Sequence, residues 1–538
     1  MVKIKKNIAA STHPPHYMMH KYWGRKPHNV VREYIESYTR EGDTVLDPFM
    51  GSGVVLIESA KCRRKSLGVD LNPLSCFLTN TSIVKLDIEA FEIAFESIYS
   101  KCFLQYSDLY ITKCPICSKN AIFENSVWVG NLIKAIKGSC ETCGPFKKNA
   151  KKFDRELLVK SNKRLLQKLE LNEKFVPKDK ILQYVKRSQK THIDQLFTTR
   201  ALLILGAIRE EIFSLKNSNI KNALLLAFSS MLPNVSKMIP GDINTVNGRS
   251  GWVVSKLWVP KIHTEKNIFN SFSSRFKKIK AGKIELNSLV EKATFKIYNQ
   301  SSENLKSIKS NTVDYIFTDP PYGESIAYFG LSMFFNSWLD YPVKYNSEII
   351  FDPYRNKRHD DYSSRLKSVF KELYRVLKPK KYLSFTFHNR DLKIWRCVID
   401  AVSDAGFSLV NIIYQEQAVQ SGTQGLNFKN TFKGDFVYNY IKGRAKKKIN
   451  KKKFLGTQEI HKKILSQVDF VYKKNKYLTS DKLFEHLIPY VIKNNLYVDS
   501  MGFPVELERI VSECYDYKQL NSREKIYGWK KKKYIHTN

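Results

Sequence analysis

Long apolar stretches are missing from this sequence, and their absence excludes the membrane-spanning classes. The longest apolar runs, such as Ala201–Ile208, are far shorter than the roughly 20 residues that a spanning helix needs. The first residues, Met1–Met19, include lysines but no continuous apolar core, so we expect no secretory signal. The sequence therefore predicts a protein with no membrane partner.

Cysteine is also scarce, with nine residues in a chain of 538. Four of the nine form two Cys-x-x-Cys pairs, and the density is far below that of a small disulfide-stabilised protein. We therefore expect reduced thiols and a cytoplasmic location.

Acidic residues are strongly outnumbered, because 51 Asp and Glu stand against 90 Lys and Arg and leave a formal net charge of +39. A surplus of this size favours a polyanionic partner such as nucleic acid. Hydrophobic residues make up 43% of the chain, which is too many for a disordered protein and enough for sizeable cores. The length indicates about two to four domains.

A glycine-rich turn lies in the segment Gly42–Pro73, "GDTVLDPFMGSGVVLIESAKCRRKSLGVDLNP". A short buried strand at 44–46 precedes "DPFMGSG", and the apolar spacing after it predicts a helix over 54–61. "SLGVD" predicts a second strand that ends in Asp70, about 20 residues beyond Gly51 and Gly53. Strand, glycine loop, helix, strand and acid in this order predict a site for a cofactor that contains a nucleoside.

A second unusual turn is "FTDPPYGES", Phe317–Ser325, which follows the apolar run at 313–316. Two adjacent prolines fix the backbone and remove two N–H groups, so Asp319 and Tyr322 are held rigidly beside carbonyls that accept hydrogen bonds. This arrangement suits recognition of an amino group. Asp-Pro and Pro-Pro are also ordinary turn signals, so this stretch by itself does not distinguish the two interpretations.

The two Cys-x-x-Cys pairs, Cys114 with Cys117 and Cys140 with Cys143, are separated by 22 residues. This spacing is typical of a tetrahedral four-cysteine zinc site with a β-hairpin between the pairs. Four thiolates leave no position for a substrate, so the predicted zinc is structural. Four free thiols are the competing interpretation.

Together, "DPFMGSG", "GVDLNP" and "DPPY" resemble the S-adenosylmethionine-dependent methyltransferases that act on the amino groups of adenine (N6) or cytosine (N4) in DNA. The segment His16–Ile35, which includes "KYWGRKPHN", is similar to the part of those enzymes that closes over the methionine end of the cofactor. With the inset Cys-x-x-Cys pairs, the chain looks most like the adenine-specific methylases that contain a zinc ribbon. The resemblance covers residues 13–80 and about 290–440, is looser across the middle, and is absent from roughly the last hundred residues.

The resemblance implies roles for individual residues. The catalytic residues would be Asp319, Pro320, Pro321 and Tyr322. Asp319 and the carbonyl of Pro320 would accept the hydrogens of the target amino group, and Tyr322 would stack on a base extruded from the duplex. The cofactor-binding residues would be Lys26, Asp47, Pro48, Phe49, Gly51, Gly53, Asp70, Asn72 and Ser301. Ser301 stands where many relatives have an acid.

The fold implied is α/β, with a doubly wound, seven-stranded, Rossmann-like methyltransferase sheet, a zinc-ribbon and helical insertion, and a helical C-terminal domain. Relatives usually place the target-reading region after the catalytic strand, whereas here a long insertion falls between the second and third strands. The predicted segments are residues 1–80 and 286–442 for the two halves of the methyltransferase domain, 81–190 for the zinc-ribbon insertion, 191–285 for its helical, target-reading part, and 443–538 for a basic linker and the C-terminal domain.

Two further segments have open interpretations. Pro240–Trp252 is a polar loop that enters DNA or connects elements. Ile441–Phe454 holds eight basic residues and no acid, which fits both a linker and a phosphate-binding run.

The function predicted is methyl transfer to adenine N6 in double-stranded DNA within a restriction-modification or phage-defence system. A separate restriction or defence subunit is a candidate partner. Cytosine-N4 methylation of DNA and amino-group methylation of tRNA or rRNA are the alternatives. A non-catalytic DNA-binding subunit is disfavoured, because such a module needs neither the intact "DPPY" nor both glycines.

Overall fold

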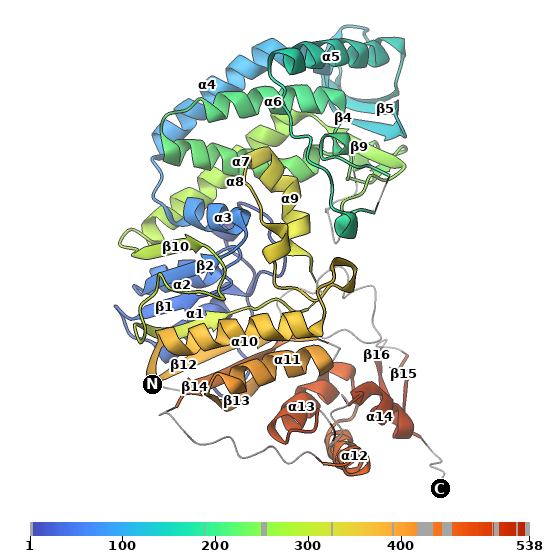
Figure 1. The fold of residues 1–538 in the computed structure, drawn as a ribbon. Coiled ribbons are helices and arrows are strands. Elements are labelled where there is room, and N and C mark those ends of the chain that lie inside the picture. The colour runs from blue at the N-terminus through green and yellow to red at the C-terminus, as the bar shows by residue number, and fades with distance from the viewer. Residues whose placement is uncertain are drawn as a thin grey trace.

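A seven-stranded, mostly parallel sheet forms the centre of the molecule (Figure 1). The computed structural model describes residues 4–187, 189–248, 256–323, 326–389, 392–416, 434–443, 455–497, 499, 505–522 and 526–532. The strands, in chain order, are β1 (Thr44–Asp47), β2 (Lys65–Asp70), β10 (Phe295–Asn299), β11 (Val313–Thr318), β12 (Leu377–Phe387), β13 (Phe407–Glu416) and β14 (Gly434–Lys442). Their spatial order is β10-β2-β1-β11-β12-β14-β13, and β14 runs antiparallel to both of its neighbours.

Both faces of the sheet are covered, which explains why its central strands are buried and mostly apolar. All six residues of β11 are buried, as expected for a parallel strand between two layers. Val45 packs in the core on one face, whereas its neighbour Leu46 packs in the core on the other. The helices that belong to the first core are α1 (His28–Tyr38), α2 (Val54–Lys61) and α3 (Pro73–Ile83), and those of the second are α10 (His359–Val376) and α11 (Leu392–Asp404). The predicted α/β class with a mostly parallel sheet is confirmed.

The insertion between α3 and β10 forms a separate lobe at one end of the sheet (top of Figure 1). Its helices are α4 (Ile88–Tyr106), α5 (Lys152–Leu171), α6 (Thr199–Phe213), α7 (Ser218–Val235) and α8 (Ile268–Leu289). Its strands are β3 (Ile111–Lys113), β4 (Asn120–Val129), β5 (Leu132–Cys140), β6 (Gly144–Asn149), β7 (Gly241–Asp242), β8 (Asn247–Gly248) and β9 (Ile262–Lys266). Strands β4 and β5 form the hairpin predicted between the two cysteine pairs.

Two helices cross the segment boundaries expected from the sequence. Helix α3 continues to Ile83, beyond the boundary at residue 80, and α8 continues to Leu289, beyond the boundary at 285. Helix α9 (Tyr328–Leu339) follows the "DPPY" turn and packs against α3 and α7, so it connects the sheet with the insertion (Figure 1).

The C-terminal segment contains helices α12 (Thr457–Lys474), α13 (Ser480–Lys493) and α14 (Leu507–Cys514). It also contains an antiparallel pair of strands, β15 (Tyr515–Asn521) and β16 (Ile526–Lys531). The segment is mainly helical, as expected, and this strand pair was not predicted; Tyr515 and Trp529 are its buried aromatic residues. The segment packs in the same core as α10 and α11. Among the described residues, none of the helices is both long and apolar enough to cross a bilayer.

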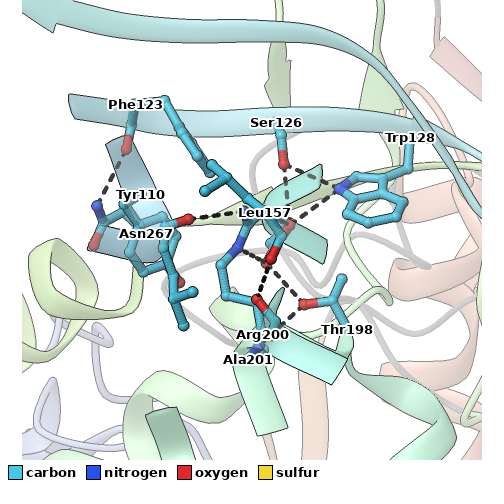
Figure 2. Close-up of polar contacts among 12 residues, drawn as sticks. Tyr110, Phe123, Ser126, Trp128, Leu157, Thr198, Arg200, Ala201 and Asn267 are labelled. Atoms are coloured by element: carbon cyan, nitrogen blue, oxygen red, sulfur yellow. Dashed lines mark hydrogen bonds and ion pairs between the residues drawn. The ribbon is translucent and has the colours of Figure 1, made fainter. Parts of the chain in front are cut away.

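A buried ion pair stabilises the insertion. Arg200 on α6 donates to both carboxylate oxygens of Glu265 on β9, at 3.0 and 2.6 Å, and both side chains are almost fully buried. Thr198 and Trp128 also donate to Glu265, so the carboxylate joins α6, β9 and β4. Figure 2 shows Arg200 and Thr198 from one side of this centre facing Ser126 and Trp128 from the other.

We expect Arg200→Met to lower the free energy of unfolding of the insertion by about 3–5 kcal/mol, because Glu265 stays buried without its partner. Chemical denaturation measures the change. The matched control is Lys152→Met, which removes an exposed pair with Glu156 (3.9 Å) and should leave the denaturation midpoint where it is. An Arg200→Met protein as stable as the wild type would contradict this role of the pair.

Candidate active site

Three acidic side chains gather at the carboxyl edge of the sheet. Asp47 and Asp70 are the last residues of β1 and β2, and Asp319 directly follows β11. These strands are adjacent and parallel, with Leu46 opposite Ile316, so their ends meet at one edge. The chain crosses from one side of β1 to the other at this point, which is where open α/β sheets bind ligands.

The glycine loop between β1 and α2 closes one side of the site. Gly51 and Gly53 have φ angles of +50° and +77°, a region that other residues rarely adopt. A Cβ at Gly53 would lie 2.4 Å from the side chain of Thr79, and one at Gly51 would lie 2.9 Å from the ring of Tyr22. The loop therefore requires glycine at both positions, for packing as well as for backbone freedom.

Asp70 holds this loop in place. Its carboxylate accepts hydrogen bonds from the amides of Gly51 (2.9 Å) and Asn72 (2.8 Å). Burial raises the pKa of Asp70 to about 6, although these amides act in the opposite direction. The carboxylate thus links the glycine loop to the start of α3.

Asp47 is more deeply buried. It accepts hydrogen bonds from the hydroxyl of Thr318 (2.8 Å) and the amide of Phe49 (3.1 Å). Burial raises the pKa of Asp47 to about 8, and the nearby Asp319 and Asp70 act in the same direction. Near neutral pH this side chain therefore holds a proton that a cationic ligand would displace.

A cavity opens between these elements, and most of the predicted site residues line it. These are Lys26, Asp47, Pro48, Phe49, Gly51, Asp70, Asn72, Ser301, Asp319 and Pro321. Gly53, Pro320 and Tyr322 lie beside the cavity without lining it.

Two of the lining residues also make local structural contacts. Asn72 caps α3 by accepting from the amide of Leu74 (3.2 Å), and it donates to Ser332 on α9 (3.0 Å). The hydroxyl of Ser301 donates to Glu303 (2.9 Å).

Other residues of the cavity were not predicted individually, although the segment His16–Ile35 was expected to close over the cofactor. They come from the N-terminal segment, from the start of α9 and from the loop before α10: Tyr22, Trp23, Arg25, Ile326, Tyr328, Phe329, Glu348 and Ile349. The aromatic and charged residues of "KYWGRKPHN" could have indicated that Tyr22, Trp23 and Arg25 line the site. Glu348 and Ile349 lie some 30 residues after the end of β11 in the sequence. Only the folded structure shows that they line the cavity.

Asp319 has three polar partners, Thr386, Lys26 and the phenol of Tyr322. The hydroxyl of Thr386 donates to Oδ1 (2.6 Å), and Nζ of Lys26 lies 3.2 Å from that atom. Burial raises the pKa of Asp319 above its usual value, and Lys26 offsets only part of that rise.

The ring of Tyr322 is fixed from several sides. It packs edge-on against Phe387 and His388, with ring centroids 5.1 and 4.9 Å away. Lys26 donates to its hydroxyl (2.8 Å), and the side-chain amide of Asn389 donates to its carbonyl (2.9 Å). His388 and Asn389, which directly follow β12, are thus neighbours of the "DPPY" turn.

The four predicted zinc ligands form a second cluster, in the insertion. The sulfur atoms of Cys114, Cys117, Cys140 and Cys143 all lie within 4.8 Å of one another. Those of Cys117 and Cys140 are 3.6 Å apart, close to the roughly 3.8 Å edge of a tetrahedron with Zn–S bonds of about 2.3 Å. Four sulfurs in this arrangement suit zinc, and the other five cysteines are free thiols.

The two segments left open by the sequence are described only in part. Gly241–Asp242 and Asn247–Gly248 of the polar loop pair as a short hairpin, and the loop's remainder, 249–252, lies outside the described residues. The basic run lies outside them from residue 444 onward.

The chain matches the model of the DNA methylase family with N6 and N4 specificity over residues 3–80 and 313–532, which is more than half of its length. The match skips the insertion. It includes the C-terminal segment, so the expectation that the resemblance ends near residue 440 is wrong.

Similarity to individual relatives is confined to short stretches. A type II methyltransferase of Methanocaldococcus jannaschii, M.MjaII, is 31% identical over 71 residues, which are 13% of this chain and 13% of that protein. An orphan methyltransferase of Bacillus amyloliquefaciens, M.BamHII, is 37% identical over 54 residues, which are 10% of this chain and 20% of the relative. The matched stretches thus span a small part of either relative.

Solved structures show only distant similarity. An S-adenosylmethionine-dependent methyltransferase of Methanosarcina mazei has a TM-score of 0.17 and 14% identity, and the match covers 30% of this chain and 79% of that one. An rRNA methyltransferase of Streptomyces viridochromogenes, aviRa, has a TM-score of 0.26 and 8% identity, with 79% and 88% covered. Scores this low support no detailed comparison.

The cysteine cluster generates a prediction about metal content. We expect one equivalent of zinc per chain by elemental analysis, and loss of that zinc in Cys140→Ser, because three thiolates and a hydroxyl bind it more weakly. Cys514→Ser, which removes a free thiol outside the cluster, is the matched control and should retain the metal. Wild-type protein that purifies without zinc and binds none on addition would refute the site.

Proposed function

Because the chain belongs to the DNA methylase family of amino-group methyltransferases, we propose that it transfers a methyl group from S-adenosylmethionine to adenine N6 in double-stranded DNA. One observation supports this most: the "DPPY" turn places Asp319 on the wall of the same cavity as the glycine loop and Asp70. A cofactor site and an acceptor of amino hydrogens therefore lie side by side.

The lining of the cavity fits S-adenosylmethionine. Asp70, at the end of the second strand, is placed to accept hydrogen bonds from ribose hydroxyls. The lining includes the acids Asp47 and Asp70, and Asp47, which is protonated near neutral pH, would ionise beside a cationic ligand. When bound, S-adenosylmethionine supplies an activated methyl group on a positively charged sulfur.

The "DPPY" residues would prepare the target amino group. Its nitrogen is a weak nucleophile, because the lone pair is delocalised into the base. Thr386 and Lys26 contact Oδ1 of Asp319, so we assign Oδ2 to one amino hydrogen and the carbonyl of Pro320 to the other, with the phenol of Tyr322 as a further neighbour of the carboxylate. The carbonyl of Pro321 already accepts from Tyr362, which fixes the turn. Rigid acceptors of this kind lower the barrier by orientation and electrostatics.

Tyr322 would hold the target base. A base inside a duplex is out of reach of the cavity, so the base must leave the stack. The ring of Tyr322 is half-buried and immobilised by Phe387 and His388, and it offers a face for stacking beside Asp319. The net charge of +39 supplies attraction for the phosphate backbone.

We assign the four cysteines to a structural zinc and the insertion to contact with DNA. We further propose a restriction-modification or phage-defence role, in which a separate restriction subunit would be a partner.

Mass spectrometry of nucleosides after incubation with labelled cofactor tests the proposed function. Unmethylated genomic DNA should yield N6-methyladenine, whereas total tRNA and rRNA should stay unlabelled. Label in N4-methylcytosine would show that the target is the cytosine N4 amino group instead of adenine N6. Label in RNA alone would refute DNA as the substrate.

Asp319→Asn should lower the rate of methyl transfer by at least about a hundredfold, because the amide no longer accepts the amino hydrogen as a charged group. The affinity for S-adenosylmethionine, measured by calorimetry, should change less than threefold. Asp314→Asn, which alters an acid at the opposite end of the same strand, is the control and should keep its activity. Near wild-type turnover in Asp319→Asn would remove the residue from the chemistry.

The protonated Asp47 predicts that cofactor binding is linked to pH. A cationic ligand stabilises the carboxylate and lowers its pKa from about 8, so binding at pH 7 should release a proton. Affinity should then rise as the pH approaches 8. Calorimetry in two buffers of different ionisation enthalpy measures the released proton, which should be lost in Asp47→Asn. Equal proton release by wild type and variant would contradict the assignment.

A further inference from the structure

Lys26 lies at the centre of a charged cluster that joins three distant parts of the chain. Its Nζ is 2.7 Å from Oδ2 of Asp435, 2.8 Å from the hydroxyl of Tyr322 and 3.2 Å from Oδ1 of Asp319. Asp435 is at the start of β14, more than 100 residues beyond the "DPPY" turn. One ammonium group thus connects the N-terminal segment, the catalytic turn and an antiparallel strand.

The cluster is shielded from water, so its charges interact strongly. The side chain of Lys26 is 12% exposed, and that of Asp435 is 4% exposed. Burial alone would lower the pKa of Lys26, but Asp319 and Asp435 outweigh it and raise that pKa. Asp435 is also paired with Nδ1 of His388, and Lys26 and His388 together hold its pKa far below the usual range.

The two carboxylates do not share Lys26 equally. The ammonium is closer to Asp435 (2.7 Å) than to Asp319 (3.2 Å), and its contact with Asp319 uses the oxygen that Thr386 already occupies. Asp435 therefore holds the ammonium group of Lys26 next to Asp319. It also prevents that ammonium from binding the Asp319 carboxylate more closely.

We propose that Lys26, held by Asp435, is a positioning residue that favours the ionised form of Asp319 without covering the carboxylate that accepts from the target amino group. This inference rests on the proposed function. During transfer the amino nitrogen forms a bond to the methyl carbon, the carbon–sulfur bond breaks and its electron pair stays on sulfur. The nitrogen then loses a proton, for which Asp319 is the nearest base. A protonated Asp319 would be unable to accept it.

Other groups also face Asp319. The titratable ones are Asp435 and His388 beyond Lys26, the phenols of Tyr322 and Tyr328, and Asp47 on the cofactor side. Asp435 and Asp47 disfavour the ionised form of Asp319, and Lys26 is the cation in direct contact with it. The charge of Lys26 should therefore determine the pH at which Asp319 becomes active.

The pH dependence of kcat/KM for DNA tests the proposal, with tritiated cofactor and unmethylated genomic DNA as the substrate. Lys26→Met should shift the acid limb of this profile upward by about 1–3 pH units, because the cation that favours the carboxylate is gone. Lys26→Arg keeps the charge and should restore much of that shift. At neutral pH, Lys26→Met should lose at least about tenfold in kcat/KM.

Asp435→Asn gives the opposite shift, which a merely structural role would not produce. Without Asp435, the ammonium interacts more strongly with Asp319, so the acid limb should move to lower pH. The same ammonium then competes with the amino group, so KM for DNA should rise. The matched control is Lys148→Met, which removes a buried pair with Asp154 (3.0 Å) in the insertion and should leave the limb in place.

Affinity for S-adenosylmethionine and thermal melting accompany each variant and show that it is folded. An unshifted acid limb in Lys26→Met together with weaker cofactor binding would overturn the proposal and make Lys26 a cofactor ligand. Shifts in the same direction for Lys26→Met and Asp435→Asn would also overturn it. If the wild type labels no DNA at any pH, the proposed function itself fails, which is a distinguishable result.

Discussion

The parallel alignment of β1 with both β2 and β11 is the constraint on which the rest of the site depends. Residues 44–47 and 313–318 are separated by some 270 positions, yet Val45 lies opposite Tyr315 and the hydroxyl of Thr318 donates to Asp47 (2.8 Å). This pairing brings Asp47, Asp70 and Asp319 to one edge, although the insertion separates the first two from the third in the chain. A shift of one residue in the register would turn alternate side chains to the other face.

Acids gathered at a buried edge repel one another, and the structure compensates in two ways. Asp47 has a pKa near 8 and holds a proton, whereas Asp70 is stabilised by the amides of the glycine loop. Asp319 has instead a cation beside it, Lys26, whose position is set by Asp435. The proposed cofactor side would thus suit a positively charged ligand, and on the proposed catalytic side Lys26 favours the ionised form of Asp319.

Local signals predicted those parts of the fold that depend on neighbouring residues. The helix over 54–61, the glycine turn and the hairpin between the cysteine pairs each follow from adjacent residue types. Asp435 was missed because it looks like an ordinary strand-start residue, and its partner Lys26 is 409 positions away. Lys26 was assigned to the cofactor alone, since sequence gives no distance to Asp319. The C-terminal strands were missed because a short basic, aromatic stretch has no distinct period.

The central claim is that the cavity at this sheet edge methylates an amino group of DNA. Methylation-sensitive sequencing of genomic DNA from cells that express the wild-type chain tests it most directly, with cells expressing Asp319→Ala as the reference. The account predicts N6-methyladenine at one recurring sequence motif in the wild-type sample and none at that motif in the reference. Genomes that are indistinguishable between the two samples would contradict it.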